Sequence, residues 1–161
     1  MNAFSIIFIL YNYCSYNLIH RKLKMIREYT NAKNIKFYVL VGFESTDASD
    51  IENMWKRVEL LMKYHCLPYI MRYRNKNETP WKTSKYSGMY IAMARWCNQP
   101  CFYKKMSFRQ FCEANQALVK TKGLICSSMR ALIDFEIENP QTAKKYFDLR
   151  YEDFTGRGER V

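Results

Sequence analysis

The cysteines are the residues of this sequence best suited to metal or redox chemistry. Cys97 and Cys101 stand in a C-x-x-x-C arrangement with Cys112 further along, but none of the six cysteines forms a C-x-x-C pair. The chain has only two histidines, His20 and His65, so the pattern does not predict a zinc ribbon or a zinc finger. We expect no metal site, and reduced thiols of a cytoplasmic protein that pack as small apolar side chains.

Motifs of the common catalytic types are also absent from the sequence, including GxSxG, the P-loop, GxGxxG and HExxH. His65 follows an amphipathic segment and has no second histidine nearby, which favours a residue at a helix end over a general base. The acidic residues Asp134, Glu136, Glu138 and Asp153 are scattered along expected surfaces. We therefore expect no catalytic residue in this chain.

Two residues at the ends of apolar runs suit ligand binding. Gly42 allows the backbone either to approach a ligand at the end of a strand or simply to turn. Arg72 ends a second run, where a guanidinium group fits a carboxylate or a phosphate, although a solvated arginine explains the position as well.

A polar and aromatic cluster follows at Tyr90, Arg95, Trp96 and Asn98. These side chains could line a substrate pocket or stack on a nucleic-acid base. A helix with a core-facing tryptophan and an exposed arginine accounts for the same pattern. Both interpretations stay open from the sequence.

The elements that position these residues follow from hydrophobic periodicity. Helical periods over 17–30 and 45–65 alternate with strand-like runs over 35–43 and 66–73, which predicts a strand–helix–strand unit with parallel strands. Further helices are expected over 85–96, from Ser107 to a C-cap at Gly123, over 127–138, and from an Asn139–Pro140 start to about 149. The tail over 155–161 is expected to fray.

Residues 3–10 are almost wholly apolar, which favours a buried strand, and such a strand could pair with 35–43. The run is too short for a membrane span, which needs about 20 apolar residues. It also lacks the basic region and cleavage site of a signal peptide. A truncated or misassigned start is a further interpretation, because the charged stretch that follows looks like the middle of a domain.

The strand–helix–strand segment resembles the late β-α-β segment of radical S-adenosylmethionine (radical SAM) enzymes. In that superfamily, a strand ending in V-G-F/L leads into an acidic turn with Ser or Thr, then a helix and another strand. Here Val-Gly-Phe at 41–43, Glu-Ser-Thr at 44–46 and Asp50 fill those places. The segment GMYIAMARWCNQP at 88–100 resembles a stretch after the barrel in some uncharacterised bacterial and phage-type members. The resemblance covers about residues 15–116.

The resemblance implies an α/β fold with part of a (β/α)6 barrel. Residues 1–76 would be the barrel segment, with its βαβ unit at 35–73, and 77–161 a helical C-terminal extension within one structural unit. An intact barrel of the eight-stranded kind typically needs about 250 residues, and this chain has 161.

The family binds a 4Fe–4S cluster through CxxxCxxC in an early loop and cleaves S-adenosylmethionine (SAM) reductively. Three thiolates are needed because one iron must stay open for SAM. This chain aligns with the second half of the barrel, and the third cysteine of such a motif would fall at Lys104. The resemblance therefore implies a C-terminal portion, truncated or degenerate, that is inactive alone. SAM and the cluster belong to the intact family, and no cofactor is expected for this chain alone.

The resemblance also implies which residues would hold the cofactor. In the family, the backbone of the last strands helps to hold the adenine. Carried over by position, that role falls on Tyr69, Ile70 and Met71, with Gly42 and Arg72 at the strand ends.

The charge of the chain bears on its partners. The formal net charge is +11, and 13 Tyr and 10 Phe are interleaved with the basic residues. This composition suits single-stranded nucleic acid, although solvated helix faces explain it too. The alternative function is thus a small basic α/β module that binds nucleic acid or an acidic protein. An open sheet edge would favour association with a missing N-terminal half or with a second copy, and we expect no membrane partner.

Overall fold

The computed structural model describes residues 8–10, 16–30 and 35–154. Three parallel strands form one sheet in the order β1-β2-β3, with bounds β1 Phe8–Leu10, β2 Lys36–Val41 and β3 Leu67–Arg72. The two predicted central strands and their parallel pairing are confirmed, with Lys36 opposite Leu67 and Val41 opposite Arg72. Part of the predicted N-terminal strand is also present, since β1 pairs with β2. Residues 3–7 and the tail over 155–161 lie outside the described residues.

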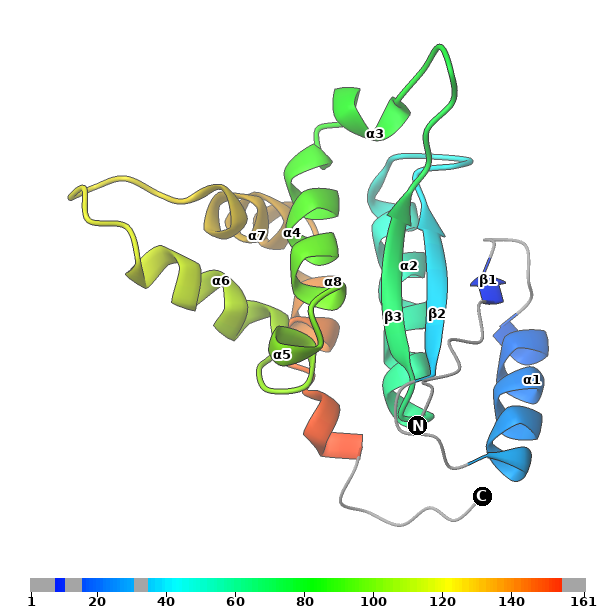
Figure 1. Cartoon of the computed structure of the whole chain (residues 1–161). Coiled ribbons are helices and arrows are strands. Elements are labelled where there is room, and N and C mark those ends of the chain that lie inside the picture. The colour runs from blue at the N-terminus through cyan, green and yellow to red at the C-terminus, as the bar shows by residue number, and fades with distance from the viewer. Residues whose placement is uncertain (1–7, 11–15, 31–34, 155–161) are drawn as a thin grey trace.

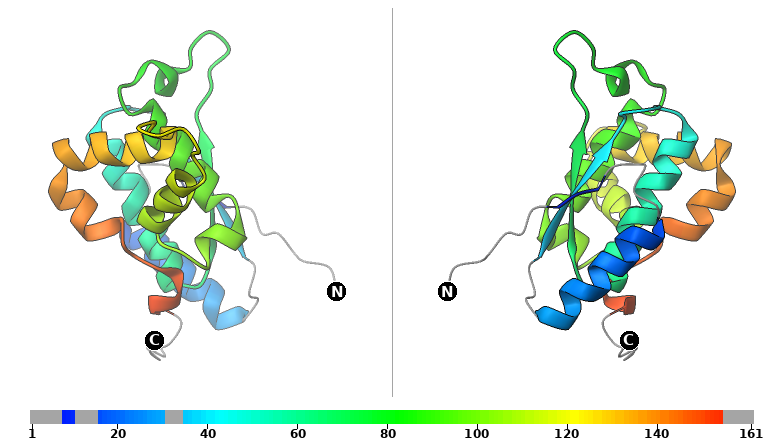
Figure 2. Two further views of the ribbon diagram at one scale, coloured as in Figure 1. Left: turned by 90° about the vertical axis from the view of Figure 1, so that its left-hand side faces the viewer. Right: turned by 90° about the vertical axis from the view of Figure 1, so that its right-hand side faces the viewer.

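Helices α1 (Tyr16–Tyr29) and α2 (Ala48–Lys63) connect the strands. Both lie on the same side of the sheet (Figure 2), as right-handed crossovers between neighbouring parallel strands require. Helix α2 begins where Asp47 accepts hydrogen bonds from the backbone N–H groups of Ser49 and Asp50 at 2.9 and 3.3 Å. Its apolar stripe, which includes Ile51 and Val58, is fully buried, so packing on the sheet holds it in place.

The second half of the chain is helical. It contains α3 (Pro80–Thr83), α4 (Ser87–Cys97), α5 (Pro100–Tyr103), α6 (Phe108–Ala117), α7 (Ser127–Glu138), α8 (Pro140–Tyr146) and the 3₁₀ turn η1 (Tyr151–Phe154). Figure 1 shows α4 beside β3, with α6 and α7 further from the sheet. The protein is therefore a mixed α/β structure with a parallel sheet and a mostly helical C-terminal part.

An aromatic cluster joins the two parts. Trp55 of α2 stacks on Tyr146 of α8 with 5.7 Å between ring centroids, and its ring lies 5.6 Å from that of Trp96 in α4. Phe108 and Phe147 complete the surroundings of Trp55 at 5.7 and 5.6 Å. Each of these rings is completely or almost completely buried. Burial of so many large side chains makes this cluster a major source of stability.

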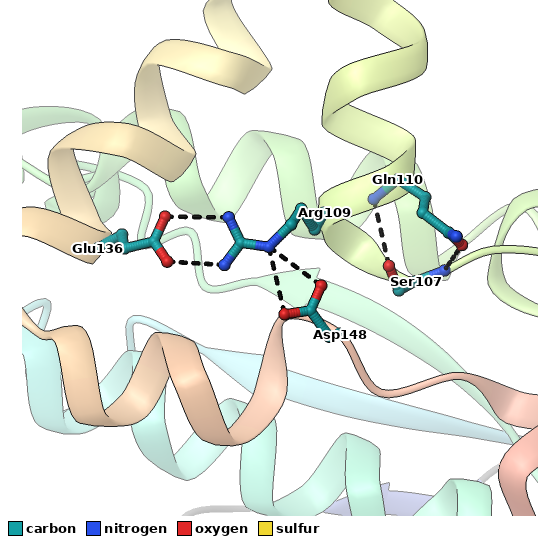
Figure 3. A network of polar contacts seen from close by, with 5 residues as sticks. All are labelled: Ser107, Arg109, Gln110, Glu136 and Asp148. Carbon is teal, nitrogen blue, oxygen red and sulfur yellow. Dashed lines mark hydrogen bonds and ion pairs between the residues drawn. The ribbon is translucent and has the colours of Figure 1, made fainter.

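Polar contacts fix the helices around that core (Figure 3). The guanidinium of Arg109 donates to both carboxylate oxygens of Glu136 at 2.7 and 3.0 Å, and its Nε donates to Asp148 at 3.0 Å. The predicted capping box is confirmed, because Ser107 and Gln110 exchange side-chain and backbone hydrogen bonds at the start of α6. Arg109 thereby ties α6 to α7 and to the segment after α8.

The predicted C-cap at Gly123 is wrong. Helix α6 ends at Ala117, and Leu118 is its C-cap. Gly123 lies in the following loop with φ of +79°. The side chain of Gln116 explains the early end, because it bonds to the backbone of Leu124 and Cys126 at 2.9 Å each. These bonds hold the loop back against the end of the helix.

Candidate functional site

One face of the sheet is left uncovered by the described helices. Phe37, Val39 and Val41 of β2 point toward α2 and are buried, while the alternate residues of β2 are half-buried or exposed. In Figure 1, α2 lies behind β2 and β3, so the uncovered face is turned toward the viewer. On β3, the side chains of Tyr69 and Met71 lie on this face and are each 39% exposed.

Aromatic side chains dominate this uncovered face. Tyr38 and Tyr69 meet edge to face with 5.2 Å between ring centroids. At the carboxyl ends of the strands, Phe43 and Tyr73 form a second such pair at 4.7 Å, and Phe43 is 47% exposed. Exposed aromatic rings on a sheet offer stacking surfaces for planar ligands.

The turn after β2 is built around a buried carboxylate. Gly42 has φ of +68°, and a Cβ atom there would lie 3.2 Å from the Cβ of Trp81, so only glycine fits without strain. The N–H of Gly42 donates to Asp50 Oδ2 at 2.8 Å. Tyr90 of α4 donates its hydroxyl to the same oxygen at 2.6 Å. The N–H of Gly42 is thus already bonded to Asp50 and does not face a ligand.

Burial and this bond to Asp50 raise the pKa of Tyr90 far above its usual value, so its phenol stays protonated as a donor. Arg57, also buried, donates to the carbonyl of Leu40 at 2.7 Å. Burial lowers the pKa of Arg57 to about 10, although Asp50 opposes that shift. The guanidinium still carries its charge at neutral pH, and its bond to the Leu40 carbonyl ties α2 to the end of β2.

The outer edge of β3 is closed by a side chain. Asn98 accepts from the N–H of Ile70 at 2.7 Å and donates to its carbonyl at 3.2 Å. The amide of Asn98 thus makes the pair of bonds that a neighbouring strand would make. Pro68 lacks an N–H on the same strand. Association of another strand at this edge would have to break the Asn98 bonds.

The residues predicted to form a substrate pocket are divided in the structure. Tyr90 and Trp96 are fully buried, and Trp96 donates its indole N–H to the carbonyl of Met106 at 3.1 Å. Asn98 holds β3, and Arg95 is exposed. Helix geometry, which turns successive side chains by about 100°, separates them into a core side and a surface side.

The residues predicted to bind a cofactor have three different surroundings. The backbone groups of Gly42 and Ile70 are occupied by Asp50 and Asn98. Tyr69 and Met71 lie on the uncovered face. The guanidinium carbon of Arg72 lies 4.3 Å from the centroid of the Trp81 ring. Of these five residues, only Tyr69, Met71 and Arg72 have side chains that are accessible to a ligand.

Sequence reasoning missed the central place of Asp50. An acid in the first turn of a helix commonly caps the N-terminus or interacts with the helix dipole, and the sequence pattern fits that role equally well. The bond to Tyr90 joins residues 40 positions apart, so no local signal marks it. The bond between Gly42 and Asp50 is local to the turn, but the contact with Tyr90 depends on how α4 packs against the sheet.

The cysteines are separated in space. Cys97 and Cys112 are buried while Cys101 is exposed. Burial raises the pKa of the Cys97 thiol well above its usual value and that of Cys112 to about 12. Within residues 8–10, 16–30 and 35–154, no three His, Cys, Asp or Glu side chains gather as metal ligands do. The thiols of Cys97 and Cys112 therefore pack as apolar core side chains.

A shallow cleft of about 520 Å³ lies between α4 and α7. Lys85 and Tyr86 both donate to Glu138 Oε2 there at 2.8 Å, and the bond from Lys85 helps to hold the pKa of Glu138 below its usual value. These polar groups satisfy one another. The cleft is therefore a less suitable ligand site than the carboxyl ends of the strands, because its polar groups already bond to one another.

Comparison with family models, with curated proteins and with solved structures finds no match to this chain. In the part of the chain that the structure describes, no helix has the length and apolar character needed to cross a bilayer.

Proposed function

We propose that this chain is the C-terminal portion of a radical SAM-like protein and that its uncovered sheet face lines the inside of a partial β/α barrel. The observation that carries the proposal is the one-sided sheet. Parallel strands whose connecting helices all lie on one face leave the other face for the barrel interior, whereas a doubly wound sheet has helices on both faces. The order of elements resembles the late part of the radical SAM barrel.

The two edges of the sheet support this placement. The β3 edge is closed by Asn98 and α4, so further strands would add beside β1. A barrel continued on that side would bring its other strands around the face that carries Tyr69 and Met71. In this arrangement these two side chains contact the adenosine part of SAM, because the Ile70 backbone is already bonded.

The residues described here do not fit a 4Fe–4S cluster. Such a cluster needs three converging thiolates, but Cys97 and Cys112 are buried thiols with raised pKa values and Cys101 is exposed. The role of this chain is to bind and orient a ligand beside a cluster held by another segment or polypeptide.

Two measurements test the proposal. Anaerobic reconstitution with iron and sulfide should leave the chain colourless and unable to cleave SAM. Equilibrium binding of SAM should weaken about tenfold in Tyr69→Ala, because stacking on one ring contributes about 1–3 kcal/mol. The control Tyr29→Ala changes an exposed tyrosine on α1 and should leave binding unchanged. A stoichiometric cluster that supports SAM cleavage, or SAM binding that is absent or insensitive to Tyr69, would contradict the proposal.

A second candidate function, single-stranded nucleic-acid binding, is favoured by the aromatic pairs Tyr38–Tyr69 and Phe43–Tyr73 on a chain of net charge +11. Bases stack on such rings while basic side chains follow the phosphates. Binding of a labelled oligonucleotide should then weaken as salt rises, because counterions are released on binding. Absence of binding at low salt would eliminate this candidate.

A further inference from the structure

Three arginines meet at the carboxyl end of β3. Arg72 is the last residue of β3, and Arg74 follows two residues later. The N–H of Tyr73 still donates to the carbonyl of Val41 at 2.9 Å, so the extended backbone continues past Arg72. Side chains alternate along an extended strand, and Arg72 and Arg74 therefore leave it on the same side.

The third arginine comes from α4. This helix runs opposite in direction to β3 (Figure 1), and the Asn98 amide fixes its end beside Ile70. Arg95 precedes Asn98 by one helical turn, about 4.5 Å along the axis. Arg72 follows Ile70 by two strand residues, about 6.6 Å in the same direction. The register set by Asn98 thus places Arg95 beside Arg72.

Electrostatics agrees with this placement. Burial lowers the pKa of the Arg72 guanidinium, and the charges of Arg74 and Arg95 lower it further. Like charges held this close repel one another unless an anion lies between them.

Within the described ranges, these three guanidinium groups have no carboxylate partner. Among the described residues, none of the ion pairs includes Arg72, Arg74 or Arg95. Arg109, in contrast, is paired with two carboxylates. The ring of Trp81, which is 4% exposed, lies 4.3 Å from the Arg72 guanidinium carbon, and Lys82 Nζ lies 5.9 Å from the centroid of the same ring.

We propose that Arg72, Arg74 and Arg95 bind the phosphate monoester of a small ligand, with Trp81 holding Arg72 in place. Guanidinium groups match phosphate oxygens in paired hydrogen bonds. Three cations suit a phosphate dianion better than a single carboxylate charge. The carboxyl end of a parallel strand is also where α/β folds commonly bind ligands. This inference stands independently of the barrel proposal.

The experiment measures binding of inorganic phosphate and of a nucleoside monophosphate by titration calorimetry, with Trp81 fluorescence as a second readout. Arg72→Gln and Arg95→Gln should each weaken binding about tenfold or more, because each substitution removes charge-assisted hydrogen bonds to the phosphate oxygens. Arg72→Lys keeps the charge but loses the paired geometry, so its affinity should fall between those of the parent and Arg72→Gln. The fluorescence change should disappear in Trp81→Phe.

Arg21→Gln is the matched control, since it removes the same charge from an exposed position on α1 and should leave affinity unchanged. Circular dichroism of every variant verifies that it is folded. The proposal is overturned if neither phosphate ligand binds, or if Arg21→Gln weakens binding as much as Arg72→Gln. It is also overturned if an oligonucleotide without terminal phosphates binds through these arginines while the monoesters do not.

Discussion

The end of the sheet and the helical C-terminal part use the same residue types in opposite ways. In the helical part, aromatic rings such as Tyr146 and Phe147 are buried and Arg109 is paired with Glu136 and Asp148. At the sheet, Tyr69 and Phe43 are partly exposed, and Arg72 has an aromatic ring beside it but no carboxylate partner among the described residues. The difference indicates that the helical part supplies stability while the sheet end keeps its groups available for a ligand.

The largest expected effect lies in the shared aromatic core. Trp55→Ala should lower the free energy of unfolding by about 4 kcal/mol, because it empties a space between four packed rings. Urea unfolding followed by circular dichroism measures the loss. Tyr69→Ala, which removes a partly exposed ring from the sheet, should cost less than about 1 kcal/mol. An equal loss of unfolding free energy in the two variants would contradict the inference that the helical part supplies most of the stability.

The buried carboxylate at the sheet end should matter almost as much. Asp50→Ala removes the acceptor for Gly42 and Tyr90 and leaves the Arg57 charge uncompensated, so we expect a loss of about 3 kcal/mol. Glu52→Ala, which breaks an exposed pair with Lys56 on the same helix, is the control and should change stability little. A small effect of Asp50→Ala would mean that the turn after β2 does not depend on this carboxylate.

The closed edge of β3 gives a smaller effect with a second consequence. Asn98→Leu leaves the N–H and carbonyl of Ile70 without their partner, which should cost about 2 kcal/mol. The freed edge should also promote self-association, detectable by sedimentation at increasing concentration. Gln99→Leu, an exposed neighbour, should do neither. A strictly monomeric Asn98→Leu variant of full stability would show that the edge is protected by α4 alone.

The smallest effect is expected for the surface network in Figure 3. Arg109→Met should lower the free energy of unfolding by about 1 kcal/mol at neutral pH, because its partners are partly exposed. The hydrogen bond from Arg109 holds the pKa of Glu136 below its usual value of 4.5. Such a group adds stability that is present above 4.5 and is lost as pH falls toward the folded-state pKa.

Unfolding measured across this pH range should therefore show a steeper decline for the parent than for Arg109→Met, so that the two curves converge in acid. The stability of Arg21→Met, which again changes an exposed position on α1, should decline in parallel with that of the parent. Curves for Arg109→Met that stay parallel to the parent would show that the pair with Glu136 does not contribute to acid sensitivity.

Local patterns in the sequence predicted most of the elements. The apolar stripe of α2, the capping box at Ser107 and the start of α8 at Pro140 each depend on residues within a few positions of one another. The parallel pairing of β2 with β3 was also predictable, because an intervening helix leaves little alternative. The end of α6 was not, since it depends on side-chain bonds from Gln116 to the loop.

The candidate sites were predictable only in part. The sequence marked Gly42, Arg72 and Arg95 as residues of interest, and their types alone determine that a turn and two guanidinium groups are available. Only the tertiary structure decided that Asn98 bonds to Ile70, that Tyr90 bonds to Asp50, and that Arg95 lies near Arg72. The physical reason is that hydrophobic patterning sets which face of each element is buried, whereas the register between distant elements depends on how their side chains pack and bond.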